Sequence, residues 1–138
     1  MPNTDRSLPA RRQLEERFQR GIALLTELSQ SGVAIAVEGR KDVAALRRLG
    51  LTGPILKLGR HSLVTLADEL SCYDRLLMLF DFDDRGEELA RQLTEQLQGR
   101  GTAILQQTRR SLRRAFSWRV RVVEGLKLLE LNRKAAKL

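Results

Sequence analysis

Short apolar runs alternate with amphipathic segments along this chain, and the alternation predicts an α/β fold. Runs at residues 33–37, 54–58, 76–80 and 102–105 have the length and composition of strands. The segments between them carry leucines at spacings of three and four, which is typical of helices with one buried face. Strands that alternate with helices in this way form parallel sheets. We therefore expect about four parallel strands flanked by helices.

The segments outside these strands complete the predicted organisation. Apolar residues recur at helical spacing from Leu14 to Leu28, so a helix precedes the first strand, with Pro9 in its first turn and Gly32 as a left-handed cap. The first seven residues show no periodicity and are expected to be disordered. The chain thus divides into an N-terminal helix at 1–32, an α/β domain at 33–107, and a basic C-terminal extension at 108–138 that packs on the same domain.

Acidic residues gather where two of the predicted strands end. Asp81, Asp83 and Asp84 follow the third strand, and Glu38 follows the first. Ligands of parallel α/β sheets bind beyond the carboxyl ends of the strands. Two carboxylates about 5 Å apart repel by roughly 3 kcal/mol at an effective dielectric near 20, so a bound cation such as Mg²⁺ would stabilise them. The alternative is a solvated loop in which Asp84 caps the next helix, as Asp42 is expected to do earlier in the chain.

Basic and small residues accompany these acids. Arg40 and Lys41 follow the first strand, Arg60 follows the second, and each could hold a phosphate group or lie solvated on the surface. Gly39 is expected to allow a sharp turn and close approach by a ligand. His61 is the only histidine, and a lone histidine in a loop is more often a surface residue than a catalyst.

The charge distribution predicts a polyanionic partner. Residues 1–107 hold 15 basic and 15 acidic residues, whereas residues 108–138 hold 10 basic residues against Glu124 and Glu130, so the whole net charge of +8 lies in this extension. Its first part predicts a basic helix at 109–117, and residues 118–138 predict a strand-like stretch and a last helix. A basic segment beside a neutral domain indicates nucleic acid, with a solubilising charged helix as the alternative. The arginines of the basic helix are Arg109, Arg110, Arg113 and Arg114.

Composition excludes several classes of protein. No apolar run approaches the eighteen or so residues that cross a membrane, and the polar N-terminus does not resemble a signal peptide. The single cysteine, Cys72, excludes an internal disulfide and a multi-thiolate metal site. We expect a cytoplasmic protein, with a protein partner or homodimerisation left open.

The motifs described above occur in a distinctive order. A buried strand ends in Glu38-Gly39, a second ends at Gly59, and Asp81-x-Asp83 follows a third, with Gly86 and Glu87 downstream. This order resembles the Toprim domain of type IA and type II topoisomerases, bacterial-type primases, old-family nucleases and a ribosomal-RNA maturase. The small stand-alone Toprim proteins of archaea and bacteria are the most similar. The resemblance covers about residues 33–107 and implies the compact, Rossmann-like Toprim fold.

The resemblance also implies roles for these residues. It makes Glu38 the general acid or base, and it makes Asp81 and Asp83 ligands of Mg²⁺ or Mn²⁺. Glu87 matches a further acid of the topoisomerase motif and is expected to bind the metal as well, and Asp84 is an extra acid that could help to bind it. The glycines of the motifs, which we expect to be structural, are Gly39, Gly59 and Gly86. The chain departs from the topoisomerase form at three positions, where Phe82, Asp84 and Arg85 replace proline, arginine and glutamate.

These observations predict a Mg²⁺-dependent protein that processes nucleic acid, RNA or DNA, as a nuclease or by phosphodiester transfer. The alternative is a non-catalytic module that binds nucleic acid or a larger complex. A phosphotransfer aspartate ranks last, because Asp-x-Asp phosphatases carry that motif on the first strand. Topoisomerase activity is excluded, since it needs a tyrosine on a separate domain and the only tyrosine is Tyr73.

Overall fold

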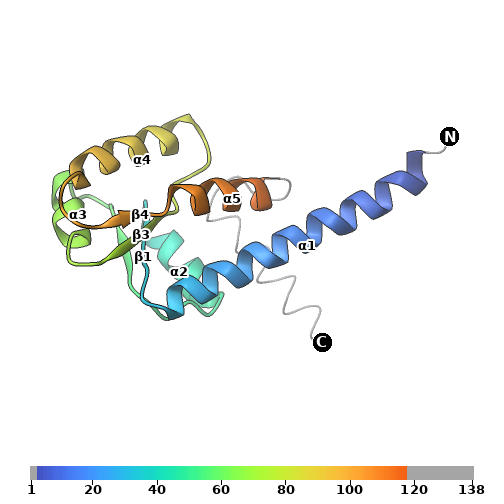
Figure 1. Ribbon diagram of the computed structural model, residues 1–138, viewed down its shortest axis with the longest axis horizontal. Helices are drawn as coiled ribbons and strands as arrows, with labels where there is room; N and C mark the ends of the chain where they lie inside the picture. Colours follow the sequence, from blue (N-terminus) through green and yellow to red (C-terminus); the bar gives the residue numbers. More distant parts are fainter. Residues whose placement is uncertain (1–2, 118–138) are drawn as a thin grey trace.

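The computed structural model is built around a parallel sheet of four short strands, as the sequence predicts (Figure 1). It describes the backbone of residues 3–117 and the side chains of residues 10–117, so the strand and helix predicted within 118–138 lie outside the described residues. The strands, in the sheet order β2-β1-β3-β4, are β1 (Ala34–Val37), β2 (Ile55–Lys57), β3 (Arg75–Met78) and β4 (Ala103–Ile104). The helices of the described part are α1 (Asn3–Gln30), α2 (Arg40–Arg48), α3 (Leu63–Leu70), α4 (Asp84–Leu97) and α5 (Gln106–Phe116).

The two central strands send alternate side chains into two hydrophobic cores. Ile35 of β1 and Leu77 of β3 face a core shared with α1, α2 and α5. Ala36 and Met78 face the opposite core, which α3 and α4 complete. Because both faces are covered, the buried positions of these strands need apolar side chains, and only Arg75 at the start of β3 is exposed and charged.

The N-terminal helix is longer than the sequence predicts. α1 begins at Asn3, so most of the segment predicted to be disordered is helical, and Pro9 lies inside the helix rather than in its first turn. Proline has no main-chain N–H and its ring crowds the carbonyl four residues earlier, so the helix lacks one main-chain hydrogen bond where it passes through Pro9. The N-terminal part of α1 extends beyond the rest of the molecule (Figure 1). Its C-terminal end is as predicted, with Gly32 at φ +86°.

The basic helix α5 is part of the same core. Phe116 is buried and packs against Phe18 of α1 and Phe82, with ring centroids 5.2 and 6.5 Å apart. α5 begins at Gln106, so the boundary predicted between residues 107 and 108 falls inside a helix. The part of the predicted extension that the structure describes, residues 108–117, therefore belongs to the α/β core.

The strand order places a switch point between β1 and β3, and we refer to this position at the carboxyl edge of the sheet as the crevice. From β1 the chain crosses to β2 on one side, and it then returns past β1 to β3 and continues outward to β4. The connections after β1 and β3 consequently diverge at the carboxyl edge of the sheet. Such a switch point is where parallel α/β sheets bind their ligands.

Gly86 allows α4 to start directly against the loop that follows β3. A Cβ atom at this position would overlap the carbonyl oxygen of Asp81 and crowd its carbonyl carbon and amide nitrogen. These are main-chain atoms, so they cannot move away as a flexible side chain could. The expected structural role of Gly86 therefore has a steric basis.

Replacing Gly86 by alanine is expected to lower the free energy of unfolding by about 3 kcal/mol, because overpacking here displaces backbone. The matched control is Gly39→Ala, since a Cβ at Gly39 would meet no atom closer than 3.9 Å. That change is expected to cost less than about 1 kcal/mol, the scale of a weakened helix cap. Urea denaturation of both variants tests the difference, and equal losses would contradict it.

Candidate functional site

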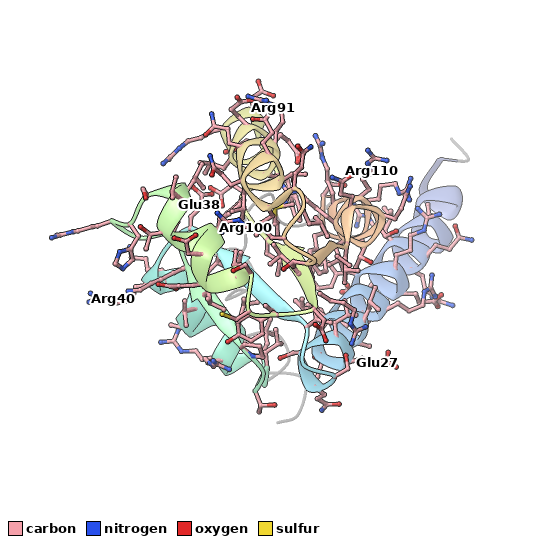
Figure 2. The ribbon with its side chains drawn as sticks, turned by 60° about the vertical axis from the view of Figure 1, so that its left-hand side comes forward. Glu27, Glu38, Arg40, Arg91, Arg100 and Arg110 are labelled. Carbon is pink, nitrogen blue, oxygen red and sulfur yellow. The ribbon has the colours of Figure 1, made fainter. Side chains whose placement is uncertain are left out.

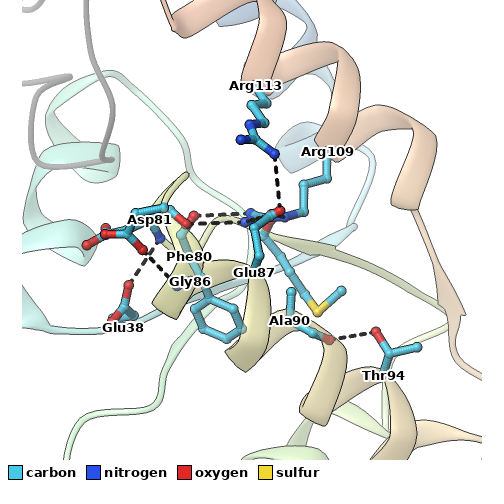
Figure 3. A network of polar contacts seen from close by, with 11 residues as sticks. Glu38, Phe80, Asp81, Gly86, Glu87, Ala90, Thr94, Arg109 and Arg113 are labelled. Atoms are coloured by element: carbon cyan, nitrogen blue, oxygen red, sulfur yellow. Dashed lines mark hydrogen bonds and ion pairs between the residues drawn. The ribbon is translucent and has the colours of Figure 1, made fainter.

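Glu38 and Asp81 meet at the switch point between β1 and β3. The main-chain N–H of Asp81 donates a hydrogen bond of 3.1 Å to Oε2 of Glu38 (Figure 3). The Glu38 side chain is only 17% exposed, and within residues 10–117 its only ion pair is a 3.9 Å contact with the exposed Arg85. The main-chain oxygen of Glu38 accepts a 2.8 Å hydrogen bond from the N–H of Gly59, whose positive φ of +54° favours glycine. The structure thus brings together residues from the ends of three strands.

The other two aspartates lie at the start of α4 rather than on a strand. β3 ends at Met78, so Asp81 and Asp83 lie beyond the strand and do not share one of its faces. Asp83 is the N-cap of α4, and its Oδ1 accepts a 2.8 Å hydrogen bond from the N–H of Gly86. Asp84 is the first helical residue, so the prediction that it caps this helix is wrong.

The Asp81 carboxyl group lies in an environment that opposes its charge. Partial burial raises its pKa to about 6, and the negative charges of Glu38, Asp42 and Asp83 add to the effect. Unlike a fully solvated carboxyl group, Asp81 is therefore disfavoured in its charged form. A divalent cation would relieve the repulsion.

Asp42 is a member of this group that our sequence interpretation assigned only to capping. Its capping role is confirmed, since the N–H of Gly39 donates a 2.9 Å hydrogen bond to Oδ2 of Asp42. The same geometry places its charge near Asp81. We expected the turn after β1 to require a glycine at position 39. The backbone of Gly39 is instead extended, at φ −146°, a conformation that any residue adopts. The sequence could have placed Asp42 in this group, because an acid in the first turn of a helix that starts directly after β1 must lie at the edge of the sheet.

Glu87 faces away from these carboxylates and binds two arginines instead. Its Oε1 accepts hydrogen bonds of 3.1 and 2.7 Å from Nε and Nη2 of Arg109, and its Oε2 lies 3.6 Å from Nη1 of Arg113 (Figure 3). Both oxygens are therefore engaged. The prediction that Glu87 binds the metal is not met in this arrangement.

Arg109 is buried and ties the end of β3 to α5. Its Nη1 donates to the carbonyl oxygens of Met78 and Phe80, at 2.9 and 3.1 Å, and its Nη2 donates to that of Asp81 at 3.3 Å. Its guanidinium also lies 5.0 Å from the ring centre of Phe82. With only 6% of the residue exposed, Arg109 cannot present its charge to nucleic acid, so that prediction is wrong. The spacing of Arg109 from Leu112 and Phe116 already indicated the buried face of α5.

The remaining predicted phosphate-binding residues lie on different surfaces. Arg110 and Arg113 line a groove of about 460 Å³ between α4 and α5. Arg114 lines a second groove, of similar volume, where α5 meets Arg17 and Arg20 of α1. Lys41 is exposed, and Arg40 and Arg60 line a hollow of about 510 Å³ beyond β2. Arg40 projects on the opposite side of the molecule from Arg110 (Figure 2).

The donor chemistry of the acidic group fits a hard cation in part. Carboxylate oxygens are the ligands that Mg²⁺ prefers, and Asp81, Glu38 and Asp83 supply them around one crevice. Within residues 10–117, however, no three or more His, Cys, Asp or Glu side chains are already grouped closely enough to hold a metal ion. A cation here would need a ligand phosphate or water to complete its coordination.

Comparisons with known proteins place the chain in a family. The fold and crevice define an α/β protein with its candidate site at the switch point of a parallel sheet. The chain is 39% identical over 117 residues to a UPF0292 protein of Pyrococcus horikoshii, covering 85% of this chain and 89% of that protein. It is 36% identical over 120 residues to a UPF0292 protein of Thermococcus sibiricus, covering 87% and 95%. It therefore belongs to the UPF0292 family.

A solved structure supports the fold. A putative protein from Aquifex aeolicus superposes with a TM-score of 0.65 over 77% of this chain and 94% of that one, at 24% sequence identity. No family model matches the chain. Among the described helices, none has the length and apolarity needed to cross a membrane.

Removing the Arg109 guanidinium should destabilise the protein strongly, because three carbonyl groups and Glu87 lose their partner. We expect Arg109→Met to lower the free energy of unfolding by about 3 kcal/mol. The neighbouring Arg110→Met removes an exposed guanidinium from the same helix and should change stability by less than about 0.5 kcal/mol. Chemical denaturation measures both, and a neutral Arg109→Met would refute the role assigned here.

Asp81→Asn should stabilise the protein near neutral pH. Because folding raises the pKa of Asp81 from 3.8 to about 6, the folded state binds this proton more tightly than the unfolded chain. The stability that this proton contributes is present below about pH 4 and is lost as the pH rises through about 6. Since the side chain is partly solvated, we expect a gain of about 1 kcal/mol near pH 7 and none near pH 4. Urea titrations across this range test the sign, and a variant less stable than wild type near pH 7 would contradict it.

Proposed function

We propose that this protein is a Mg²⁺-dependent, Toprim-like nuclease or related phosphodiester-processing protein that acts on RNA or DNA. The observation that supports the proposal most directly is the Glu38–Asp81 contact at the switch point, with the pKa of Asp81 raised by neighbouring carboxylates. In structural ion-pair networks, basic side chains usually neutralise clustered carboxylates. Here the acids lie together in a crevice, which is the arrangement expected of a cation and phosphate site.

Each acid has a distinct role in this proposal. Asp81 and Asp83 hold the cation, and Asp83 does so with the oxygen that α4 does not use, because only its Oδ1 binds Gly86. Bound Mg²⁺ would offset the negative charge that develops on the phosphodiester. Glu38 moves a proton to or from the reacting oxygen. The exposed Arg85 can leave its 3.9 Å contact with Glu38 when a substrate enters.

A nucleic-acid-binding module without chemistry is the second candidate. The observation in its favour is the pair of arginine-lined grooves beside α5, whose described lining residues do not include Glu38, Asp81 or Asp83. Such a module would bind nucleic acid with a salt dependence set by these arginines, with or without Mg²⁺.

The two candidates differ in a cleavage assay with Mg²⁺ or Mn²⁺ on end-labelled structured RNA, single-stranded DNA and duplex DNA. If the acids form a catalytic centre, we expect metal-dependent cleavage of one class. Asp83→Asn should reduce it by about 100-fold, the effect expected when a metal ligand is lost. Asparagine is also a good N-cap, so this change should preserve α4.

Glu27→Gln is the matched control, because it removes one negative charge from α1, far from Glu38 (Figure 2). It should cleave as the wild type does. Metal-independent cleavage, or full activity in Asp83→Asn, would refute the nuclease. Binding without turnover that weakens in an Arg110, Arg113 and Arg114 triple alanine variant would support the binding module.

A further inference from the structure

A basic hollow adjoins the carboxylates at the end of β2. Arg40, Lys57, Gly59, Arg60 and His61 line it, and its volume is about 510 Å³. These residues come from the first turn of α2, the last position of β2 and the loop that follows. Sequence reasoning treated Arg40 and Arg60 as separate candidates, gave no role to Lys57 and left His61 as a surface residue. The fold brings all four side chains to one place.

The described part of the chain does not neutralise the cations of this hollow. No acidic residue within residues 10–117 lines it, and none of them forms an ion pair with Arg40, Lys57 or Arg60. The groove between α4 and α5 differs, because Glu87 and Glu95 lie among its arginines. The hollow therefore holds the stronger uncompensated positive charge, and an anion would be stabilised there.

The hollow and the carboxylates share the same edge of the sheet. β1 and β2 are hydrogen-bonded neighbours, and the N–H of Gly59 donates a 2.8 Å hydrogen bond to the carbonyl of Glu38. Arg40 lies two residues after Glu38, and both appear on the same side of the molecule in Figure 2. Opposite charges thus lie side by side without pairing with one another. A ligand that carries both a cation and phosphate groups would satisfy both.

We propose that this hollow is a phosphate subsite and that it selects nucleic-acid strands with a phosphorylated end. The inference rests on the proposed function and adds the substrate class to it. A terminal phosphate monoester carries a charge of about −1.5 to −2 at neutral pH, whereas an internal phosphodiester carries one negative charge. Three cations without an acid favour the more highly charged group. A strand held by its end here places a nearby phosphodiester at Glu38 and Asp81.

The only histidine of the chain provides a local reporter of this subsite. The NMR resonances of the His61 imidazole are followed during titrations without metal. The titrants are inorganic phosphate and one oligonucleotide in three forms, with a 5′-phosphate, with a 3′-phosphate and with hydroxyl ends. We expect saturable shifts with one phosphorylated form, at about tenfold lower concentration than with hydroxyl ends. Arg60→Ala and Lys57→Ala should each weaken this binding about tenfold, whereas Arg100→Ala, an equal loss of charge in the loop before β4, should leave it unchanged.

The outcomes separate this inference from the proposed function. Phosphate-dependent shifts that occur in both the wild type and Asp81→Asn, together with no cleavage by the wild type, would keep the subsite and reject the nuclease. Cleavage that depends on Asp83 but is equal for phosphorylated and hydroxyl ends, with unchanged His61 resonances, would overturn the subsite and keep the nuclease. Shifts that are lost in Arg100→Ala and kept in Arg60→Ala would also overturn it.

Discussion

The candidate site depends on one buried guanidinium. Arg109 uses all five of its N–H groups at the end of β3, where main-chain carbonyls have passed beyond the sheet and lack strand partners. An unpaired buried carbonyl would cost about 1–3 kcal/mol, so this loop needs a donor from elsewhere in the fold. α5 supplies it, and in doing so it also engages Glu87. The basic helix is therefore a structural part of the crevice rather than an appendage beside it.

The carboxyl edge of the sheet keeps opposite charges apart. Glu38, Asp81, Asp42 and Asp83 form one group, and the cations beyond β2 form another. Elsewhere, exposed charges pair locally, as Arg91 does with Glu88 and Glu95 on α4. Within the acidic group, the charged form of Asp81 is disfavoured, and a bound cation would favour it.

Sequence patterns predicted the sheet and the meeting of Glu38 with Asp81, because apolar runs and strand ends are local features. They did not predict which carboxylate oxygens already accept hydrogen bonds from other parts of the protein. Whether Glu87 faces the crevice or Arg109 depends on where α5 packs, and the packing of α5 depends on contacts with Phe18 almost a hundred residues earlier. Likewise, Asp83 rather than Asp84 became the cap because β3 ended early, which depends on pairing between strands. Charge counts located the basic segment correctly but could not separate a buried arginine from exposed ones.

The crowding at Gly86 has a consequence for how the crevice responds to a ligand. The main chain of Asp81 is held from three directions: by Arg109, by the carboxylate of Glu38, and by the close approach of α4. Because this backbone is already ordered, a ligand that binds at Asp81 should pay only a small entropic penalty for fixing it. The crevice is preorganised, and its response to a ligand lies in side-chain rotamers and protonation rather than in closure of a loop.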